Sequence, residues 1–202
     1  MTITASGNQI VQIASSEQDG EDFTVTNVET IDATNSAAGN ELRAYDETNT
    51  WLIDTGNGGS VAGVDFTNFA NLVGGSNDDT FTISATVTRI ETGDGTNEVT
   101  VNSGGSISVA LTGGSNDDTF TIEENAAVTS IDTGDGVNNV TVNSDGSISD
   151  SITGGDGVDT VTINGSAGSI DTGANDDAIT IGGTVSGVID GGSGVEDVLT
   201  IT

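Results

Sequence analysis

Carboxylates and glycines recur together in short turns of this sequence, and their pattern favours the binding of a hard cation. The second residue of every turn is glycine and the fourth is glycine or asparagine, with aspartates beside them. Glycine and asparagine tolerate the left-handed backbone conformation, so the carbonyl groups of every turn would point the same way. Carboxylate and carbonyl oxygens, with no nitrogen or sulfur ligand available, suit Ca²⁺ better than a transition metal. The turns begin at Gly74, Thr92, Gly113, Thr133, Gly154, Thr172 and Gly191.

The candidate metal ligands are the aspartates of these turns. Stacked at the spacing of neighbouring strands, like charges would lie about 5 Å apart, which costs on the order of 1 kcal/mol or more for each pair. A cation between successive turns would remove that cost. Asn97 and Asn138 replace an aspartate in two turns, where we expect weaker or missing sites. The alternative is that the aspartates only solubilise exposed turns. The predicted calcium ligands are Asp78, Asp79, Asp94, Asp117, Asp118, Asp135, Asp156, Asp159, Asp176, Asp177 and Asp197.

The elements that would position these turns are short alternating strands. After each turn, apolar and polar residues alternate, and a second apolar pair follows in each repeat. Matching turn positions recur every 18 to 21 residues between Asp79 and Asp197, a period typical of a solenoid. The sequence therefore predicts an all-β fold, a parallel β-solenoid with about 20 residues and two strands per coil. We expect residues 49–202 to form one regular solenoid, in which residues 51–72 form coils of the same kind with a less regular sequence. Residues 1–48 are expected to form degenerate coils or a cap.

The composition excludes several classes of function. The 202 residues include 33% apolar and 3% aromatic residues, which suits a thin core of stacked rows better than a thick globular interior. The formal net charge of −30 argues against binding to nucleic acid or an anionic membrane. Without His, Cys or Lys the chain lacks the usual catalytic bases and nucleophiles, so we expect no enzyme. A polysaccharide lyase is disfavoured because Arg43 and Arg89 are the only basic side chains.

The segment from Gly154, GGDGVDTVT, matches the calcium-binding repeat of the RTX (repeats-in-toxin) family position by position. The resemblance implies that Asp159 binds Ca²⁺ together with turn carbonyls. It implies the same role for Asp79, Asp118 and Asp177, whose turns carry asparagine at the second repeat glycine. It also implies a right-handed solenoid and type I secretion without a cleaved signal peptide, the chain folding outside the cell where Ca²⁺ is abundant. RTX turns occur twice per coil, whereas these occur once, so a single metal row is expected.

The one-sided repeats also resemble those of giant bacterial adhesins, including a calcium-dependent ice-binding module, over residues 49–202. An outward threonine follows every turn, and such a row on a flat sheet could order water into an ice-like lattice. The plainer explanation is that threonine favours strands. Glu98, Asn139, Ala178 and Val198 interrupt the neighbouring outward row, which weakens the ice-binding alternative. The row consists of Thr82, Thr100, Thr121, Thr141, Thr162, Thr180 and Thr200.

The two ends of the predicted solenoid favour self-assembly. A solenoid leaves unpaired backbone at its ends unless a cap covers them, and contacts that do not close generate open filaments. We therefore expect a secreted, calcium-dependent structural protein whose copies stack head to tail into an extracellular filament or surface layer. The alternatives are an adhesin stalk module, an ice-binding module, a true N-terminal cap, or a fragment of a longer chain. The predicted assembly residues are Ile3, Ile10, Ile13, Val198, Leu199 and Ile201.

Overall fold

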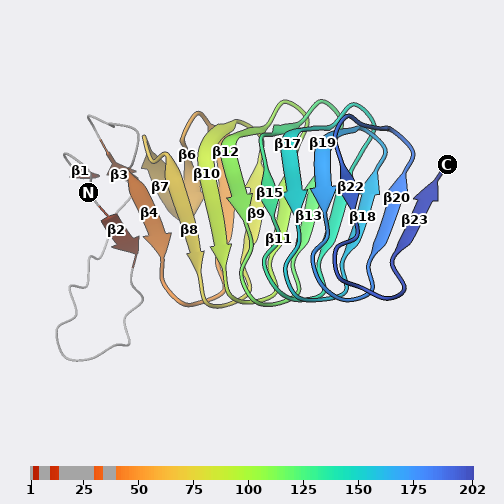
Figure 1. Ribbon diagram of the computed structural model, residues 1–202. Coiled ribbons are helices and arrows are strands. Elements are labelled where there is room, and N and C mark those ends of the chain that lie inside the picture. The colour runs from red at the N-terminus through yellow and green to blue at the C-terminus, as the bar shows by residue number, and fades with distance from the viewer. Residues whose placement is uncertain (1, 5–9, 14–29, 34–39) are drawn as a thin grey trace.

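The computed structural model describes residues 2–4, 10–13, 30–33 and 40–202, and the strands before residue 30 are described without their side chains. The described residues form strands and no helix, so they include no helix that could cross a membrane. The strands wind into about seven coils of about 20 residues. The coils stack along one axis, with β1 and β2 at one end and β23 at the other (Figure 1). The predicted all-β parallel solenoid is confirmed.

Two parallel sheets form the long sides of the stack. The first sheet has the order β1 (Thr2–Thr4), β3 (Thr30–Asp32), β7 (Val64–Thr67), β6 (Gly58–Val61), β5 (Thr50–Thr55), β9 (Thr80–Ile83), β11 (Glu98–Val101), β13 (Thr119–Ile122), β16 (Asn139–Val142), β18 (Thr160–Ile163), β20 (Ala178–Ile181) and β23 (Val198–Ile201).

The second sheet is made of the return strands of the same coils. Its order is β2 (Ile10–Ile13), β4 (Glu41–Ala44), β8 (Asn71–Gly75), β10 (Thr86–Gly93), β12 (Ser106–Thr112), β14 (Ala127–Val128), β17 (Ser147–Thr153), β19 (Ser166–Asp171) and β21 (Thr184–Val185). Two short strands complete it: β15 (Ile131–Asp132) pairs with β12 and β17, and β22 (Ile189–Asp190) pairs with β19.

The core is a stack of apolar rows that the strand alternation points inward. In β11, Val99 and Val101 are buried while Glu98 is exposed and Thr100 is half-buried. Each inward residue pairs in register with its equivalents in the neighbouring coils, as Val99 does with Phe81 and Phe120. Because both sheets contribute such rows, one continuous apolar cluster runs through the coils from Ile31 to Ile181.

Residues 50–67 do not form the simple coil that the sequence predicts. After β5 the chain turns back, β6 pairs antiparallel with both β5 and β7, and β7 then joins β3 in parallel. This meander inserts two extra strands into the first sheet only. Trp51 stacks on Phe81 at 5.2 Å between ring centroids and meets Phe66 edge-on at 5.8 Å. Large aromatic side chains therefore fill the core where the two sheets have unequal numbers of strands.

Candidate metal-binding corner

One residue of each acidic turn points into the corner between the sheets, and together these residues form what we call the inner ladder. All of its members except the exposed Asp197 are buried. The Oδ1 atom of each member after the first accepts the backbone N–H of the member one coil earlier, at 2.7–3.0 Å. The inner ladder consists of Asn49, Asp79, Asn97, Asp118, Asn138, Asp159, Asp177 and Asp197.

The asparagines of the inner ladder satisfy both sides of their amide groups. Asn97 Nδ2 donates to the carbonyl oxygens of Gly93 at 3.1 Å and Gly95 at 3.0 Å, both in its own turn. It also donates to Asp118 Oδ1 at 3.0 Å. Asn138 repeats the pattern with its own turn carbonyls, those of residues 134 and 136. The side-chain Nδ2 group therefore donates hydrogen bonds to turn carbonyl oxygens that would otherwise face one another without a donor.

The aspartates of the inner ladder lack that donor. The Oδ2 atoms of Asp79, Asp159 and Asp177 are buried and receive no hydrogen bond from the described part of the chain. Asp118 Oδ2 receives one long bond of 3.3 Å from the backbone N–H of Gly114. A carboxylate and an asparagine amide are planar and of similar shape, and they share the same Oδ1 contact here. We infer that Oδ2 occupies the place that Nδ2 has in the asparagine coils.

Burial changes the proton affinity of these carboxyl groups. Desolvation raises the pKa of Asp79, Asp118 and Asp159 from 3.8 to about 6, against the lowering effect of the N–H groups that they accept. For Asp159, the charge of Asp177 also raises the pKa. The charged form of each carboxylate is therefore disfavoured by burial, and a proton or a cation beside Oδ2 would offset that cost.

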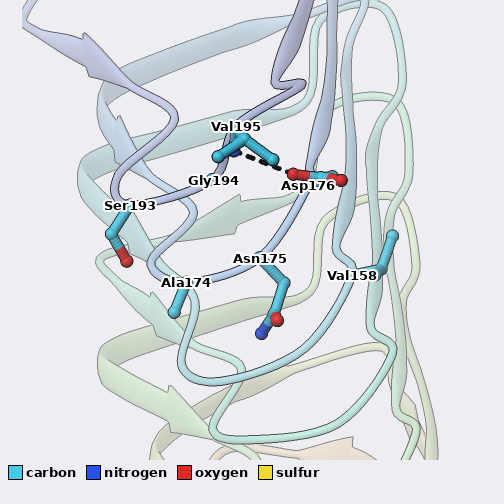
Figure 2. Close-up of a pocket in the computed structure, with 7 residues that line it drawn as sticks. All are labelled: Val158, Ala174, Asn175, Asp176, Ser193, Gly194 and Val195. Atoms are coloured by element: carbon cyan, nitrogen blue, oxygen red, sulfur yellow. Dashed lines mark hydrogen bonds between the residues drawn. The ribbon is translucent and has the colours of Figure 1, made fainter.

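The remaining predicted ligands are exposed and occupy the third or the fifth position of their turns; together we call them the outer row. Successive turn residues point to opposite sides, so Asp78 faces solvent while Asp79 faces inward. The outer carboxylates cap the next coil: Asp78 Oδ1 accepts the Thr96 N–H at 2.8 Å. Asp176 Oδ1 accepts the Val195 N–H at 2.9 Å beside a shallow pocket on this corner (Figure 2). The outer row consists of Asp78, Asp94, Asp117, Asp135, Asp156 and Asp176.

The structure does not bring the eleven predicted ligands together as carboxylate clusters. Within the described ranges, no three acidic, histidine or cysteine side chains converge on one point. A cation at this corner would therefore take one buried Oδ2 together with carbonyl oxygens of the turns, which are the hard oxygen ligands that Ca²⁺ accepts. The donor set fits Ca²⁺ at the aspartate coils and not at the asparagine coils, where Nδ2 holds the place.

Sequence reasoning did not identify Asn49 as a member of the inner ladder. The meander separates it from Asp79 by 30 residues, which breaks the 18–21-residue period. The signal was nevertheless present, because Asn49-Thr-Trp-Leu-Ile matches Asp79-Thr-Phe-Thr-Ile in its apolar alternation. Asn97 and Asn138 were expected only as defective metal sites, and their donor role becomes visible once neighbouring coils are in register.

The outward threonines lie in one uninterrupted row on the first sheet. Each pairs in register with the next, from Thr82 in β9 to Thr200 in β23. The row is half-buried along most of its length. Leu52, which is 40% exposed, continues it into β5. The structure thus arranges these residues as a regular polar stripe, flanked by the mixed row that includes Glu98.

The last coil leaves inward-facing apolar side chains uncovered. Leu199 and Ile201 pair in register with the buried Ile179 and Ile181, yet they are 51% and 76% exposed. No described strand lies over them. At the opposite end, β1 and β2 are the outermost described strands of the two sheets. The side chains of Ile3, Ile10 and Ile13 lie outside the description, so only their backbone pairing with β3 and β4 is known.

Comparison of the chain with protein-family models, with curated proteins and with solved structures finds no match. The arguments for function therefore rest on the geometry of the inner ladder, the threonine row and the two ends.

Proposed function

We propose that this chain is a calcium-dependent structural protein that stacks end to end into an extracellular filament or surface layer. The observation that carries the proposal is the parallel, in-register pairing of every coil from β9 to β23, which a second copy could continue. Leu199 and Ile201 present the same apolar surface that each internal coil presents to its neighbour. Covering such side chains stabilises by about 25 cal/mol for each Å² of apolar surface removed from water.

The topology allows a second copy to continue both sheets. Following the pairings through the first sheet, β1 runs parallel to β23, because the two antiparallel steps at β6 restore the original direction. In the second sheet, β2 and the strands β21 and β22 are the outermost described strands at the two ends. A second copy placed with its β1 beside β23 would repeat the parallel pairing found between coils. Such a head-to-tail contact does not close on itself and generates a filament.

Charge makes this assembly dependent on cations. Each copy carries a formal net charge of −30, so two copies repel unless counter-ions neutralise them. Calcium bound at the corner would lower this repulsion and fill the positions beside the buried Oδ2 atoms. The resemblance to RTX repeats supports secretion into a calcium-rich medium. A structural role also suits a chain without His, Cys or Lys.

The proposal is tested by electron microscopy and sedimentation with Ca²⁺ and with EDTA. We expect filaments or long oligomers in Ca²⁺ and none in EDTA. Leu199→Asp should abolish assembly, because it places a charge in the end contact. Val109→Asp is a matched control, since Val109 is 45% exposed on the lateral face of the second sheet. A strict monomer at high protein concentration in Ca²⁺ would refute stacking and favour the adhesin stalk module.

The threonine row supports a second candidate function, binding to ice. The seven threonines from Thr82 to Thr200 are in register on one strand face, so their hydroxyl and methyl groups repeat at the strand spacing of about 4.8 Å. Thermal hysteresis of the folded protein tests this candidate. Glu98 and Asn139 interrupt the neighbouring outward row. The regular threonine surface is therefore one row wide and not two.

A further inference from the structure

We infer that the coils differ in their need for calcium: the inner-ladder asparagines make their own turns independent of the ion, whereas the run Asp159, Asp177 and Asp197 requires it to close. The inference rests on the proposed calcium dependence and specifies where in the chain it acts. Its consequence is that calcium controls the same end of the solenoid that is proposed to bind the next copy.

The asparagine coils contain their own donor. Asn97 Nδ2 reaches two carbonyl oxygens of its turn and the carboxylate of Asp118 in the next coil. Asn49 Nδ2 similarly donates to the carbonyl of Tyr45 at 3.0 Å and to Asp79 Oδ1 at 3.0 Å. A cation at either place would have to displace an amide nitrogen that already donates to turn carbonyl oxygens and to a carboxylate. We therefore expect no bound cation at Asn49 or Asn97.

Asparagines also separate the carboxylates in the earlier coils. Asp79 lies between Asn49 and Asn97 in the inner ladder, and Asp118 lies between Asn97 and Asn138. Each of these two aspartates accepts a side-chain amide hydrogen as well as a backbone N–H from the coil before it. The carboxylates are thus two coils apart and partly compensated.

The pattern changes after Asn138. Asp159, Asp177 and Asp197 occupy three successive coils of the inner ladder. Asp177 Oδ1 accepts only the Asp159 N–H, at 2.7 Å, and Asp197 Oδ1 accepts only the Asp177 N–H, at 3.0 Å, among the described contacts. Asp159 still accepts the side-chain amide of Asn138, whereas no asparagine immediately precedes Asp177 or Asp197 in the ladder. The Oδ2 atoms of Asp159 and Asp177, like that of Asp79, are buried and have no donor among the described residues. In this run, carboxylates of successive coils lie next to one another, so a bound cation would offset more electrostatic repulsion here than elsewhere in the ladder.

This run immediately precedes the exposed end surface. Asp197 is followed directly by β23, which carries Leu199 and Ile201. Ordering of the Asp197 turn determines whether β23 pairs with β20 and presents its free edge. Calcium would thus act as a local condition for assembly, and the earlier coils would depend on it less because their inner-ladder carboxylates are two coils apart.

Reciprocal substitutions in the inner ladder test the inference. Asp177→Asn supplies the missing amide: we expect one fewer Ca²⁺ bound per chain by isothermal titration and a melting temperature in EDTA about 3–6 °C higher, the size expected for one buried hydrogen-bonding group in a chain of this length. Asn138→Asp should have the opposite effects, with one additional ion and a lower melting temperature in EDTA. Asp176→Asn makes the same charge change in the exposed outer row and should change neither quantity.

The inference is overturned if Asp177→Asn is no more stable than the parent protein in EDTA, or if Asp176→Asn reproduces its effects. These readouts do not depend on filaments. If the ion count and the melting temperature shift as expected while no assembly occurs in Ca²⁺, the end-to-end stacking is wrong and the present inference stands. If Asp177→Asn also assembles at a lower Ca²⁺ concentration than the parent protein, calcium control of the end surface is supported directly.

Discussion

The metal-free protein should lose stability as the pH rises from 5 to 7.5, the reverse of the usual behaviour of carboxylates that are paired in the folded state. Burial raises the pKa of Asp79, Asp118 and Asp159 to about 6, whereas the ordinary value of 3.8 applies in the unfolded chain. The folded state therefore retains protons that the unfolded chain has released. The resulting stability is fully present below about pH 3.8 and is lost as the pH passes about 6.

The size of the loss follows from the pKa shift. A shift of about 2 pKa units corresponds to about 3 kcal/mol per carboxyl group over the whole pH range. Roughly 1.4 kcal/mol of this falls between pH 5 and pH 7.5, so three independent groups would lose about 4 kcal/mol. Domains are typically stable by only about 5–15 kcal/mol. The metal-free solenoid should therefore lose a large fraction of its free energy of unfolding between pH 5 and pH 7.5.

Urea denaturation in EDTA at these two pH values measures the effect, and both lie above the sequence pI of about 4.1. The single tryptophan, Trp51, is fully buried and reports on the core by fluorescence. Asp118→Asn should remove about a third of the pH-dependent loss, because it replaces one of the three carboxyls with an amide. Asp117→Asn, on the exposed neighbour, should leave the loss unchanged. Stability that stays level or increases from pH 5 to pH 7.5 would refute the assignment of buried, protonatable carboxyls.

Three further substitutions and one control test the packing and the surface. Phe120→Ala should lower the free energy of unfolding by about 3–5 kcal/mol in a denaturant titration in Ca²⁺, because Phe120 is fully buried. Val109→Ala, on the exposed face, should change the free energy of unfolding by less than about 0.5 kcal/mol. Gly93→Ala should lower the melting temperature, because Gly93 has a φ of +85° and a Cβ there would overlap the carbonyl oxygen of Gly75. Thr121→Tyr should abolish any thermal hysteresis while leaving the melting temperature within a few degrees, and retention of hysteresis would exclude the threonine row.

The sequence was sufficient to predict the solenoid because its signals are local and repeated. Every coil carries the same glycine-containing turn and the same alternation, so the in-register row from Thr82 to Thr200 follows from the period alone. The meander at 50–67 could not be predicted in this way. An antiparallel strand has the same period of two as a parallel one, and Gly58 and Gly59 were indistinguishable from the turn glycines around them.

The inner ladder was only half predicted, and the reason is physical. The repeat resemblance favours Asp118 as a ligand, but its neighbour Asp117 is also an acidic turn residue; in the structure, alternation directs Asp117 to solvent and Asp118 into the corner. An asparagine in the ladder could either weaken a metal site or replace the metal with hydrogen bonds of its own. Which of these applies depends on the groups that its amide contacts. Asn97 contacts carbonyls two and four residues earlier and a carboxylate 21 residues later. Only the stacked geometry reveals the last of these contacts.

The alternation of amides and carboxylates explains how so acidic a chain can wind at all. With coils about 4.8 Å apart, carboxylates in successive coils repel by about 3.5 kcal/mol at an effective dielectric constant of about 20, and carboxylates two coils apart by about 1.7 kcal/mol. Asn97 and Asn138 therefore halve the repulsion along the earlier inner ladder and donate hydrogen bonds to it. From Asp159 to Asp197 the larger repulsion remains, and among the described ladder side chains only the Asn138 amide, at the start of this run, offsets part of it. If calcium binds as proposed, the residues that make the sequence look like an imperfect metal-binding repeat are those that lower the repulsion in the first coils, and the run with an aspartate in every coil is where a cation would offset the most repulsion.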